Sequence, residues 1–385
     1  MIFSPHTWMS WCGTALAAAV ATYTVLAAYA ARSRLKPYLP APSLAPAVTV
    51  LKPLCGAEHE LYECLRSFCD QDYPRLQIVF GVSDPDDPAI GVVFRLMREF
   101  PHVDMDMAVD HRQHGSSRKV SNLINMMPFA RHELLVLSDS DVRVGRDYLA
   151  RVVAPLADSG VGIVTCSYTG RPRGGFWSLL GALFIDDWFT PSVRVAAMFG
   201  SRSFAFGATI AIRRQVLRRI GGFASIANQL ADDYRLGEMT RAIGLRTVLS
   251  DVVVETCVNE SSLTELVRHE LRWLRTIRIV RPLGYGLSFV TFGVPVAALG
   301  AVLAGCALPA ITLLAVTALA RLVLHLRVRG ADLPPAHQLM MLPLRDVLSV
   351  ALWMWGFATR RVQWRADSFH VARDGSADPV VRDAA

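Results

Sequence analysis

The segment most informative about the fold is Glu133-Leu134-Leu135-Val136-Leu137-Ser138-Asp139-Ser140-Asp141-Val142-Arg143-Val144. Its apolar half does not alternate with polar residues, which is typical of a parallel strand that is covered on both faces. Asp139 and Asp141 follow at the carboxyl end of that strand, where open α/β sheets bind ligands. Such oxygen ligands suit Mg²⁺ or Mn²⁺, which commonly also hold substrate phosphates. A turn without a ligand is the alternative, because Asp and Ser are common in turns.

Strands and helices alternate along the chain and predict a parallel α/β sheet. We expect strands at 48–51, 77–82 and 134–137, and helices at 61–69 and 90–100. The second strand ends in an acidic cluster that begins at Asp84, and the third ends at Asp139. Because the carboxyl ends of parallel strands meet at one edge of a sheet, these carboxylates are expected to lie along the same edge.

Three further segments complete the predicted site. The segment 115–122 is rich in Gly and Ser and carries Lys119, so it is expected to be a loop that holds a diphosphate, or else a solvated loop before a helix. Asp232 and Asp233 precede a helix predicted at 234–243, and a general base is expected at Asp233, with Asp232 capping the helix. A strand is expected at 204–209, where Gly207 lets the backbone approach a ligand closely.

The composition indicates a membrane protein. Of the 385 residues 52% are hydrophobic and 19% are charged, and the mean hydropathy is +0.32. The apolar segment 7–31 is long enough to cross a bilayer. A signal peptide is the rival interpretation, but basic residues follow the segment rather than precede it. By the positive-inside rule the rest of the chain then begins in the cytoplasm.

The carboxyl-terminal third contains further apolar segments. Spans are expected at 284–308 and 310–326, forming a hairpin, and 339–357 is expected to be interfacial or re-entrant because Arg345 and Asp346 interrupt it. The segment 174–206 is expected to be an amphipathic helix that lies at the membrane surface and receives the acceptor, or else a core helix with an acidic end. The seven cysteines show no CxxC pair or zinc spacing, so buried, reduced thiols are expected.

These observations divide the chain into predicted parts. We expect a membrane anchor at 1–36, a proline-rich linker at 37–46, a catalytic domain at 47–282, a transmembrane hairpin at 283–330, an interfacial or re-entrant region at 331–372 and a disordered tail at 373–385.

The order of short motifs resembles a known family. Val50-Leu51-Lys52-Pro53-Leu54, the Asp84 cluster, Asp139-Ser140-Asp141, Ala231-Asp232-Asp233-Tyr234 and Arg272-Trp273 follow in the order seen in membrane glycosyltransferases. Over residues 48–281 the chain resembles the ceramide glucosyltransferase-like family of GT-A enzymes, and within it the bacterial hopanoid-biosynthesis glycosyltransferases. The resemblance implies a Rossmann-like, mostly parallel GT-A sheet with transmembrane helices at both ends. It also implies inverting transfer from a UDP-sugar to a lipid hydroxyl at the cytoplasmic face of the inner membrane.

The resemblance assigns roles to individual residues. Asp84 is expected near the nucleotide, Asp139 and Asp141 at the metal and diphosphate, and Asp233 as the general base. Lys52 and Lys119 are expected to contact the substrate.

The family's last motif begins with Gln or Arg and ends in Arg-Trp. Here it reads His269-Glu270-Leu271-Arg272-Trp273. His269, Arg272 and Trp273 are therefore expected at the donor, with His269 departing from the pattern. Most of the neighbouring arginines are expected to face lipid phosphates.

The preferred substrates are UDP-N-acetylglucosamine and a hopanoid polyol such as bacteriohopanetetrol. UDP-glucose and ceramide are the close alternative. A processive polysaccharide synthase is a weaker rival, as is a membrane-surface binding protein without activity. The net charge of +7 is not accompanied by a nucleic-acid-binding motif, so DNA or RNA partners are not expected.

Overall fold

The computed structural model describes residues 5–32, 45–57, 60–201, 204–329, 336–358, 361–364, 367–371 and 377–379. The chain forms two compact units, each built from separate segments. One unit comprises Met1–Arg34, Pro172–Gly200 and Glu260–Ala366, and is mostly helical. The other comprises Leu35–Arg171, Ser201–Asn259 and Asp367–Ala385, and contains the main sheet. Within the range 47–282, which was predicted as one domain, residues 172–200 and the last residues, 260–282, belong to the helical unit.

The sheet unit is built around a mixed sheet, which has eight strands within the described residues, in the order β3-β2-β1-β4-β7-β6-β8-β5. The first four strands in this order are parallel, with Val50 paired to both Ile78 and Val136. Strand β7 runs antiparallel to β4, and Val136 pairs with Ala211. The strands are β1 (Val48–Pro53), β2 (Leu76–Val82), β3 (Asp104–Val109), β4 (Leu134–Leu137), β5 (Val142–Arg143), β6 (Val161–Pro172), β7 (Ile210–Arg213) and β8 (Arg246–Val258).

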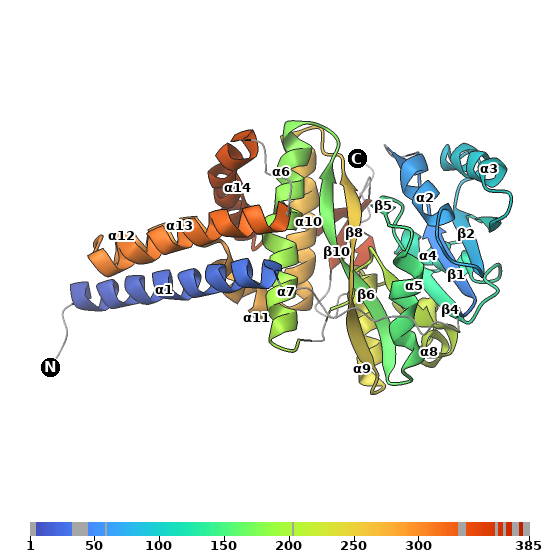
Figure 1. The fold of residues 1–385 in the computed structure, drawn as a ribbon, viewed down its shortest axis with the longest axis horizontal. Helices are drawn as coiled ribbons and strands as arrows, with labels where there is room; N and C mark the ends of the chain where they lie inside the picture. Colours follow the sequence, from blue (N-terminus) through green and yellow to red (C-terminus); the bar gives the residue numbers. More distant parts are fainter. Residues whose placement is uncertain are drawn as a thin grey trace. The chain divides into compact units, whose positions relative to one another are not determined.

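Apolar residues cover both faces of this sheet, which explains why its central strands have no polar alternation. On one face Val50 and Phe80 pack in a core with Phe68 of α2. On the other face Leu51 and Leu135 join a second core. The helices of this unit are α2 (Leu61–Cys69), α3 (Ala89–Glu99), α4 (Arg118–Met126), α5 (Tyr148–Val153), α8 (Arg214–Arg219) and α9 (Asp232–Ala242), with 3₁₀ turns at Ala154–Ala157 and Phe223–Ile226 (Figure 1).

The sequence predictions for this unit are largely confirmed. Strand β4 and helix α2 have the predicted bounds, and β1, β2, α3 and α9 differ from theirs by at most two residues. Two predictions are wrong. Residues 204–209 form a loop with an isolated bridge between Phe206 and Thr209, and the strand begins at Ile210. The predicted loop 115–122 ends early, because Ser117 caps α4 by accepting from the Val120 backbone N–H.

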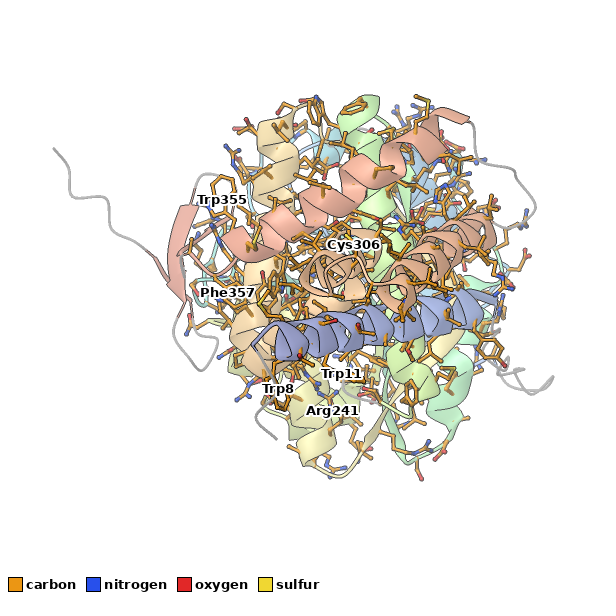
Figure 2. The ribbon with its side chains drawn as sticks, turned by 90° about the vertical axis from the view of Figure 1, so that its left-hand side faces the viewer. Trp8, Trp11, Arg241, Cys306, Trp355 and Phe357 are labelled. Carbon is orange, nitrogen blue, oxygen red and sulfur yellow. The ribbon has the colours of Figure 1, made fainter. Side chains whose placement is uncertain are left out.

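The helical unit contains two helices that are long and apolar enough to cross a membrane, among the residues described. These spans are Thr7–Ala31 within α1 (Pro5–Arg32) and Leu308–Val328 within α13 (Leu308–Arg329). Apolar side chains project outward from them. Trp11 on α1 is 68% exposed and Leu308 is 77% exposed, and Figure 2 shows Trp8 and Trp11 on α1. An outward apolar surface is the arrangement expected of helices that face lipid.

The apolar segment predicted as one span at 284–308 is broken in the structure. Helix α11 (Pro282–Leu287) and a 3₁₀ turn (Ser288–Thr291) are bent by 78° from α12 (Gly293–Leu303). The pair is either one broken span or a re-entrant segment. The bend lies at Phe292, between the 3₁₀ turn and α12.

The remaining helices of this unit are one long helical segment and two helices that a buried ion pair connects. A long helical segment consists of α6 (Phe176–Phe184), a π-helical turn (Ile185–Phe189) and α7 (Thr190–Met198). Helix α10 (Leu263–Val280) is joined to α14 (Ala336–Trp355) because Arg345 Nη1 and Nη2 donate to Glu270 at 2.6 and 2.8 Å. Arg345 is 1% exposed, so α14 is tied to the protein by its polar residues.

The last part of the chain is described only in short pieces. These are β9 (Arg361–Trp364), and β10 (Asp367–Val371) paired with β11 (Ala377–Pro379). The other residues of the predicted tail, 33–36 of the predicted anchor and 37–44 of the predicted linker lie outside the described residues.

Candidate functional site

The turn between β4 and β5 carries Asp139 and Asp141 and is held by three hydrogen bonds to strands β1 and β8. Ser138 N donates to Leu51 O at 3.2 Å, which continues the pairing of β4 with β1. Thr256 Oγ1 on β8 donates to Asp141 Oδ2 at 2.6 Å, and Cys257 N donates to Asp141 O at 3.0 Å. The carboxylates therefore occupy fixed places at the carboxyl edge of the parallel strands.

Lys52, which is predicted to contact the substrate, supports the turn that carries Asp139. It is fully buried, donates from Nζ to the carbonyl of Asp139, and lies 3.9 Å above the Phe68 ring. Burial lowers the pKa of Lys52 to about 8, although nearby thiols and carboxylates oppose the change. Lys52 thus holds the turn in place from below and reaches a ligand only through Asp139.

Lys119, in the first turn of α4, pairs with Asp139, which follows β4, and with Asp232 of α9. Its Nζ lies 2.5 Å from Asp139 Oδ1 and 3.5 Å from Asp232 Oδ2. Burial disfavours the charged ammonium, but the carboxylates of Asp139, Asp232 and Asp233 outweigh burial and raise the pKa of Lys119. Lys119 therefore remains a cation between β4 and α9.

Asp233 lies in the first turn of α9 and is held by two backbone donors. Gly207 N donates to its Oδ2 at 2.9 Å and Tyr234 N to its Oδ1 at 2.7 Å. Burial, followed by repulsion from Asp232, raises the pKa of Asp233 to about 6, while Lys119 and the two backbone donors oppose the rise. This carboxylate is thus a better proton acceptor than an ordinary aspartate and still mostly ionised at neutral pH.

Asp232 does not cap α9 as expected. The N-cap residue is Ala231, and Asp232 lies inside the first turn, 8% exposed, with Lys119 as its partner.

Gly207 marks the point where these groups converge. A Cβ added to it would lie 3.0 Å from Asp139 Oδ2, 3.2 Å from Lys119 Nζ and 3.6 Å from Asp233 Oδ2. The absence of a side chain leaves space between the Asp139 carboxylate and the candidate base. A small residue at such a position is typical where a ligand approaches the backbone closely.

Asp84 lies at the same sheet edge, after β2, but outside this cluster of contacts. Its side chain is exposed, and Oδ1 accepts from Asp86 N at 2.9 Å. Asp87 is the more structural of the neighbouring acids, because it accepts from Gly56 N and from Ala89 N and is 9% exposed. An exposed carboxylate at this edge is available to a nucleotide.

The two carboxylates suit a divalent cation whose coordination a substrate completes. Among the described residues, no group of three or more His, Cys, Asp or Glu side chains is arranged to hold a metal ion. Asp139 and Asp141 nevertheless interact electrostatically: burial, then the charge of Asp139, raises the pKa of Asp141. A cation between them relieves this repulsion, and Mg²⁺ or Mn²⁺ is commonly bound by one or two carboxylates together with substrate phosphates. Asp139 and Asp141 therefore fit a metal that is completed by a diphosphate.

His269, Arg272 and Trp273 lie on α10, in the helical unit. His269 Nδ1 lies 2.5 Å from Glu260 Oε1, and its ring meets the Trp273 ring edge-on at 4.7 Å. Glu260 is 7% exposed. The imidazole is therefore held by a buried carboxylate and an indole, which orients its other nitrogen, while Arg272 is half-buried on the same helix.

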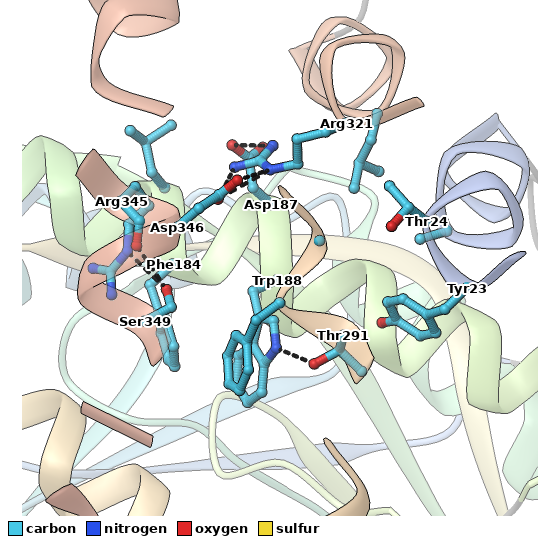
Figure 3. A pocket seen from close by; sticks show the side chains of 15 residues that line it. Tyr23, Thr24, Phe184, Asp187, Trp188, Thr291, Arg321, Arg345, Asp346 and Ser349 are labelled. Carbon is cyan, nitrogen blue, oxygen red and sulfur yellow. Dashed lines mark hydrogen bonds and ion pairs between the residues drawn. The ribbon is translucent and has the colours of Figure 1, made fainter. Parts of the chain in front are cut away.

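The helical unit also contains a buried polar network that the sequence reasoning missed. Arg321 Nη1 lies 3.2 Å from Asp187 Oδ2, and Arg321 Nη2 lies 3.0 Å from Asp346 Oδ1. His325 Nδ1 lies 2.9 Å from Asp187 Oδ2. Asp187, Arg321 and Asp346 line a cavity of about 20 Å³, which has room for one water molecule (Figure 3). The sequence indicates only that partners exist, because ionisable residues inside apolar segments are rarely left unpaired, and it does not show which residues pair.

Comparisons with known proteins agree with this architecture. A profile of glycosyl transferase family 21 matches residues 10–377. The chain belongs to glycosyl transferase family 21. Proteins similar to this chain include ceramide glucosyltransferase 3 of Caenorhabditis elegans, 23% identical over 60% of this chain and 50% of the relative. The ceramide glucosyltransferase of Komagataella phaffii is 35% identical over 31% of this chain and 24% of the relative. The chain thus spans at most about half the length of these two curated relatives.

A solved structure supports the fold of this family-21 chain. The mannosyltransferase PcManGT from Pyrobaculum calidifontis, determined with GDP-Man and Mn²⁺, superposes with a TM-score of 0.55 at 23% identity. The match covers 91% of this chain and 99% of that one. The predicted GT-A-like α/β fold with apolar helices at both ends is confirmed.

Proposed function

We propose that this chain is a membrane glycosyltransferase that moves a sugar from a UDP-sugar to a lipid hydroxyl, with inversion at the anomeric carbon. The observation that carries the proposal is the position of Asp233, whose carboxylate has a raised pKa and converges with Asp139 and Lys119 around Gly207. Transfer to a hydroxyl needs a base at the nucleophile and positive charge at the leaving diphosphate. This sheet edge supplies groups suited to both needs.

In the proposed reaction Asp233 accepts the proton of the acceptor hydroxyl. The oxygen forms a bond to the anomeric carbon while the bond from that carbon to the diphosphate breaks. The N–H groups of Gly207 and Tyr234 fix the direction of the carboxylate before the acceptor arrives. A base that is positioned in advance avoids reorganisation during the reaction.

Asp139 and Asp141 would hold Mg²⁺ or Mn²⁺, which supplies positive charge to the leaving diphosphate when bound. Lys52 and Thr256 keep the two carboxylates in place for this task. Lys119 remains protonated and is a second source of positive charge for the diphosphate. On the helical unit, Arg272 and the oriented His269 are proposed to contact the donor, with Trp273 packing beside His269.

The helical unit is proposed to anchor the enzyme in the inner membrane in several passes, with the sheet unit in the cytoplasm. The outward apolar side chains of α1 and α13 support the anchoring. The basic residues after the first span support the orientation. The lipid acceptor is proposed to enter along the α6–α7 segment, as the sequence suggested.

A hopanoid polyol with UDP-N-acetylglucosamine is the proposed substrate pair, on the resemblance of the motifs to hopanoid-pathway enzymes. Ceramide with UDP-glucose is the second candidate, and it is favoured by the names of the curated relatives.

The test uses the purified full-length chain in detergent with Mn²⁺. Each of the two UDP-sugars is combined with each of the two lipids, and the lipid products are identified by mass. We expect an N-acetylhexosamine adduct of the hopanoid polyol. Formation of glucosylceramide alone would replace the first pair by the second, and the absence of any glycolipid with all four combinations would contradict the proposed substrates.

A further inference from the structure

Two thiols from distant parts of the sequence meet inside the sheet unit. Cys64 on α2 and Cys257 near the end of β8 are 193 residues apart, yet their Sγ atoms lie 3.5 Å from each other. Cys64 is 1% exposed and Cys257 is 8% exposed. A disulfide bond is about 2.05 Å long, so the sulfur atoms need to approach by only about 1.5 Å to become bonded.

This thiol pair is connected to the candidate metal carboxylate. Cys257 N donates to the carbonyl of Asp141 at 3.0 Å, and the preceding residue, Thr256, donates to the Asp141 carboxylate at 2.6 Å. A displacement of Cys257 toward α2 is therefore passed directly to Asp141.

The pair differs chemically from the other buried cysteines of this unit. Burial raises the pKa of Cys69, on the same helix, to about 12, and it raises that of Cys166 to about 12 as well. In Cys64 the hydrogen bond with Cys257 lowers the pKa, burial opposes this, and the charge of Lys52 lowers it further. The thiolate is the form that reacts with oxidants, so this lowering favours Cys64 over Cys69 and Cys166 as the attacking sulfur.

We propose that Cys64 and Cys257 are an oxidation site, at which a hydroperoxide converts the two thiols into a disulfide that links α2 to β8. The Cys64 thiolate attacks a peroxide oxygen, the O–O bond breaks, and a sulfenic acid forms as hydroxide or alcohol leaves. The Cys257 sulfur then attacks the sulfenic sulfur, the S–S bond forms, and the S–O bond breaks with loss of water. The two sulfur atoms together lose two electrons, which the peroxide gains.

The consequence for turnover rests on the proposed function, whereas the bond itself does not. If Asp141 holds the metal, closing the disulfide moves this carboxylate away from its place. A displacement of a reacting group by about 1 Å can lower a rate by about 10²-fold, so we expect oxidation to reduce turnover by tenfold or more. Reduction by dithiothreitol should restore it.

The test treats the purified full-length protein with hydrogen peroxide, removes the peroxide with catalase, blocks free thiols with N-ethylmaleimide and analyses the peptides by mass spectrometry. We expect a Cys64–Cys257 cross-linked peptide that dithiothreitol removes. Cys69→Ser is the matched control, because Cys69 lies on the same helix and is 3% exposed. That variant should form the cross-link as the unaltered protein does.

Recovery of Cys64 and Cys257 as N-ethylmaleimide adducts after peroxide treatment would overturn the proposal, and so would a cross-link that joins other cysteines. This readout needs neither an active enzyme nor a variant that folds. If the cross-link forms while turnover is unchanged, the site stands and the proposed role of Asp141 fails. Loss of turnover that persists in Cys64→Ser would show that peroxide acts elsewhere.

Discussion

The exchange Asp233→Asn should abolish activity and stabilise the protein at the same time. Asparagine keeps the shape of the side chain and one acceptor oxygen for the Gly207 or Tyr234 N–H, but it cannot take a proton. Removal of a general base typically lowers turnover about 10²–10⁴-fold. Donor affinity should change little, because the exchange leaves Asp139, Asp141 and Lys119 in place.

The stability effect follows from the raised pKa of Asp233. Folding raises it from the ordinary value near 3.8 to about 6, so the folded state binds more protons than the unfolded state between these pH values. The free energy of unfolding therefore falls as pH rises from 3.8 to 6 and stays lowered above 6. At 1.36 kcal/mol for each pH unit the effect is at most about 3 kcal/mol. The side chain is partly exposed, and asparagine leaves one of the two backbone N–H groups without an acceptor, so we expect Asp233→Asn to stabilise by at most about 1–2 kcal/mol at pH 7.5.

The assay measures turnover, UDP-sugar affinity and the thermal midpoint of the detergent-purified protein at pH 4.0 and 7.5. Stabilisation should appear at pH 7.5 and nearly vanish at pH 4.0. The matched control is Asp232→Asn, which removes the neighbouring carboxylate and a partner of Lys119 but leaves the base. It should cost far less turnover and lower the pKa of Asp233.

Two results would refute the reasoning on Asp233. Unchanged turnover in Asp233→Asn would remove the base assignment. Loss of turnover in Asp232→Asn alone would move it by one residue.

Three other predictions concern the same site, and a fourth concerns membrane topology. Asp141→Asn should weaken metal dependence and turnover together, and unchanged activity across a Mn²⁺ titration would remove Asp141 from the metal site. In the unaltered protein kcat/KM should rise with pH through an apparent pKa of about 6, because Asp233 must be ionised to act as a base; a profile that is flat between pH 5 and 7 would contradict this. Gly207→Ala should lower turnover by about tenfold to a hundredfold with little change in the thermal midpoint, because its Cβ would crowd Asp139 and Lys119; turnover equal to that of the unaltered protein would show that this space is not used. Exposed Cys55 should resist an impermeant maleimide in sealed cells without an outer membrane and react after lysis, whereas labelling before lysis would place the sheet unit outside.

Local patterns in the sequence predicted the sheet and its acidic edge well. The run Leu134–Leu137 is apolar on both faces of a buried strand, and the Asp139 turn follows it, so both the element and its ligand edge could be inferred. The placement of Gly207 beside the site was expected. The strand expected at 204–209 was wrong, because this segment forms a loop in which the Gly207 backbone N–H turns toward Asp233.

Contacts between distant segments could not be predicted, because they leave no local pattern. Lys52 looked like a ligand-binding cation at a strand end, and only the packing of Phe68 and the Asp139 carbonyl around it reveals that it is buried. The pairing of Arg345 with Glu270 joins residues 75 positions apart. Asp187 and Arg321 are 134 positions apart. In the sequence, the ionisable residues of these pairs only interrupt an apolar or a basic segment, and the structure is needed to identify their partners.

The most direct measurement follows both products of the proposed reaction in one vessel. Purified protein is incubated with Mn²⁺, a UDP-sugar and the acceptor lipid, and released UDP and glycolipid are quantified together for the unaltered protein and for Asp233→Asn. The proposal predicts UDP and glycolipid in equal amounts from the unaltered protein, and both lowered together in the variant. UDP release without glycolipid, or glycolipid formed by the variant at the unaltered rate, would contradict it.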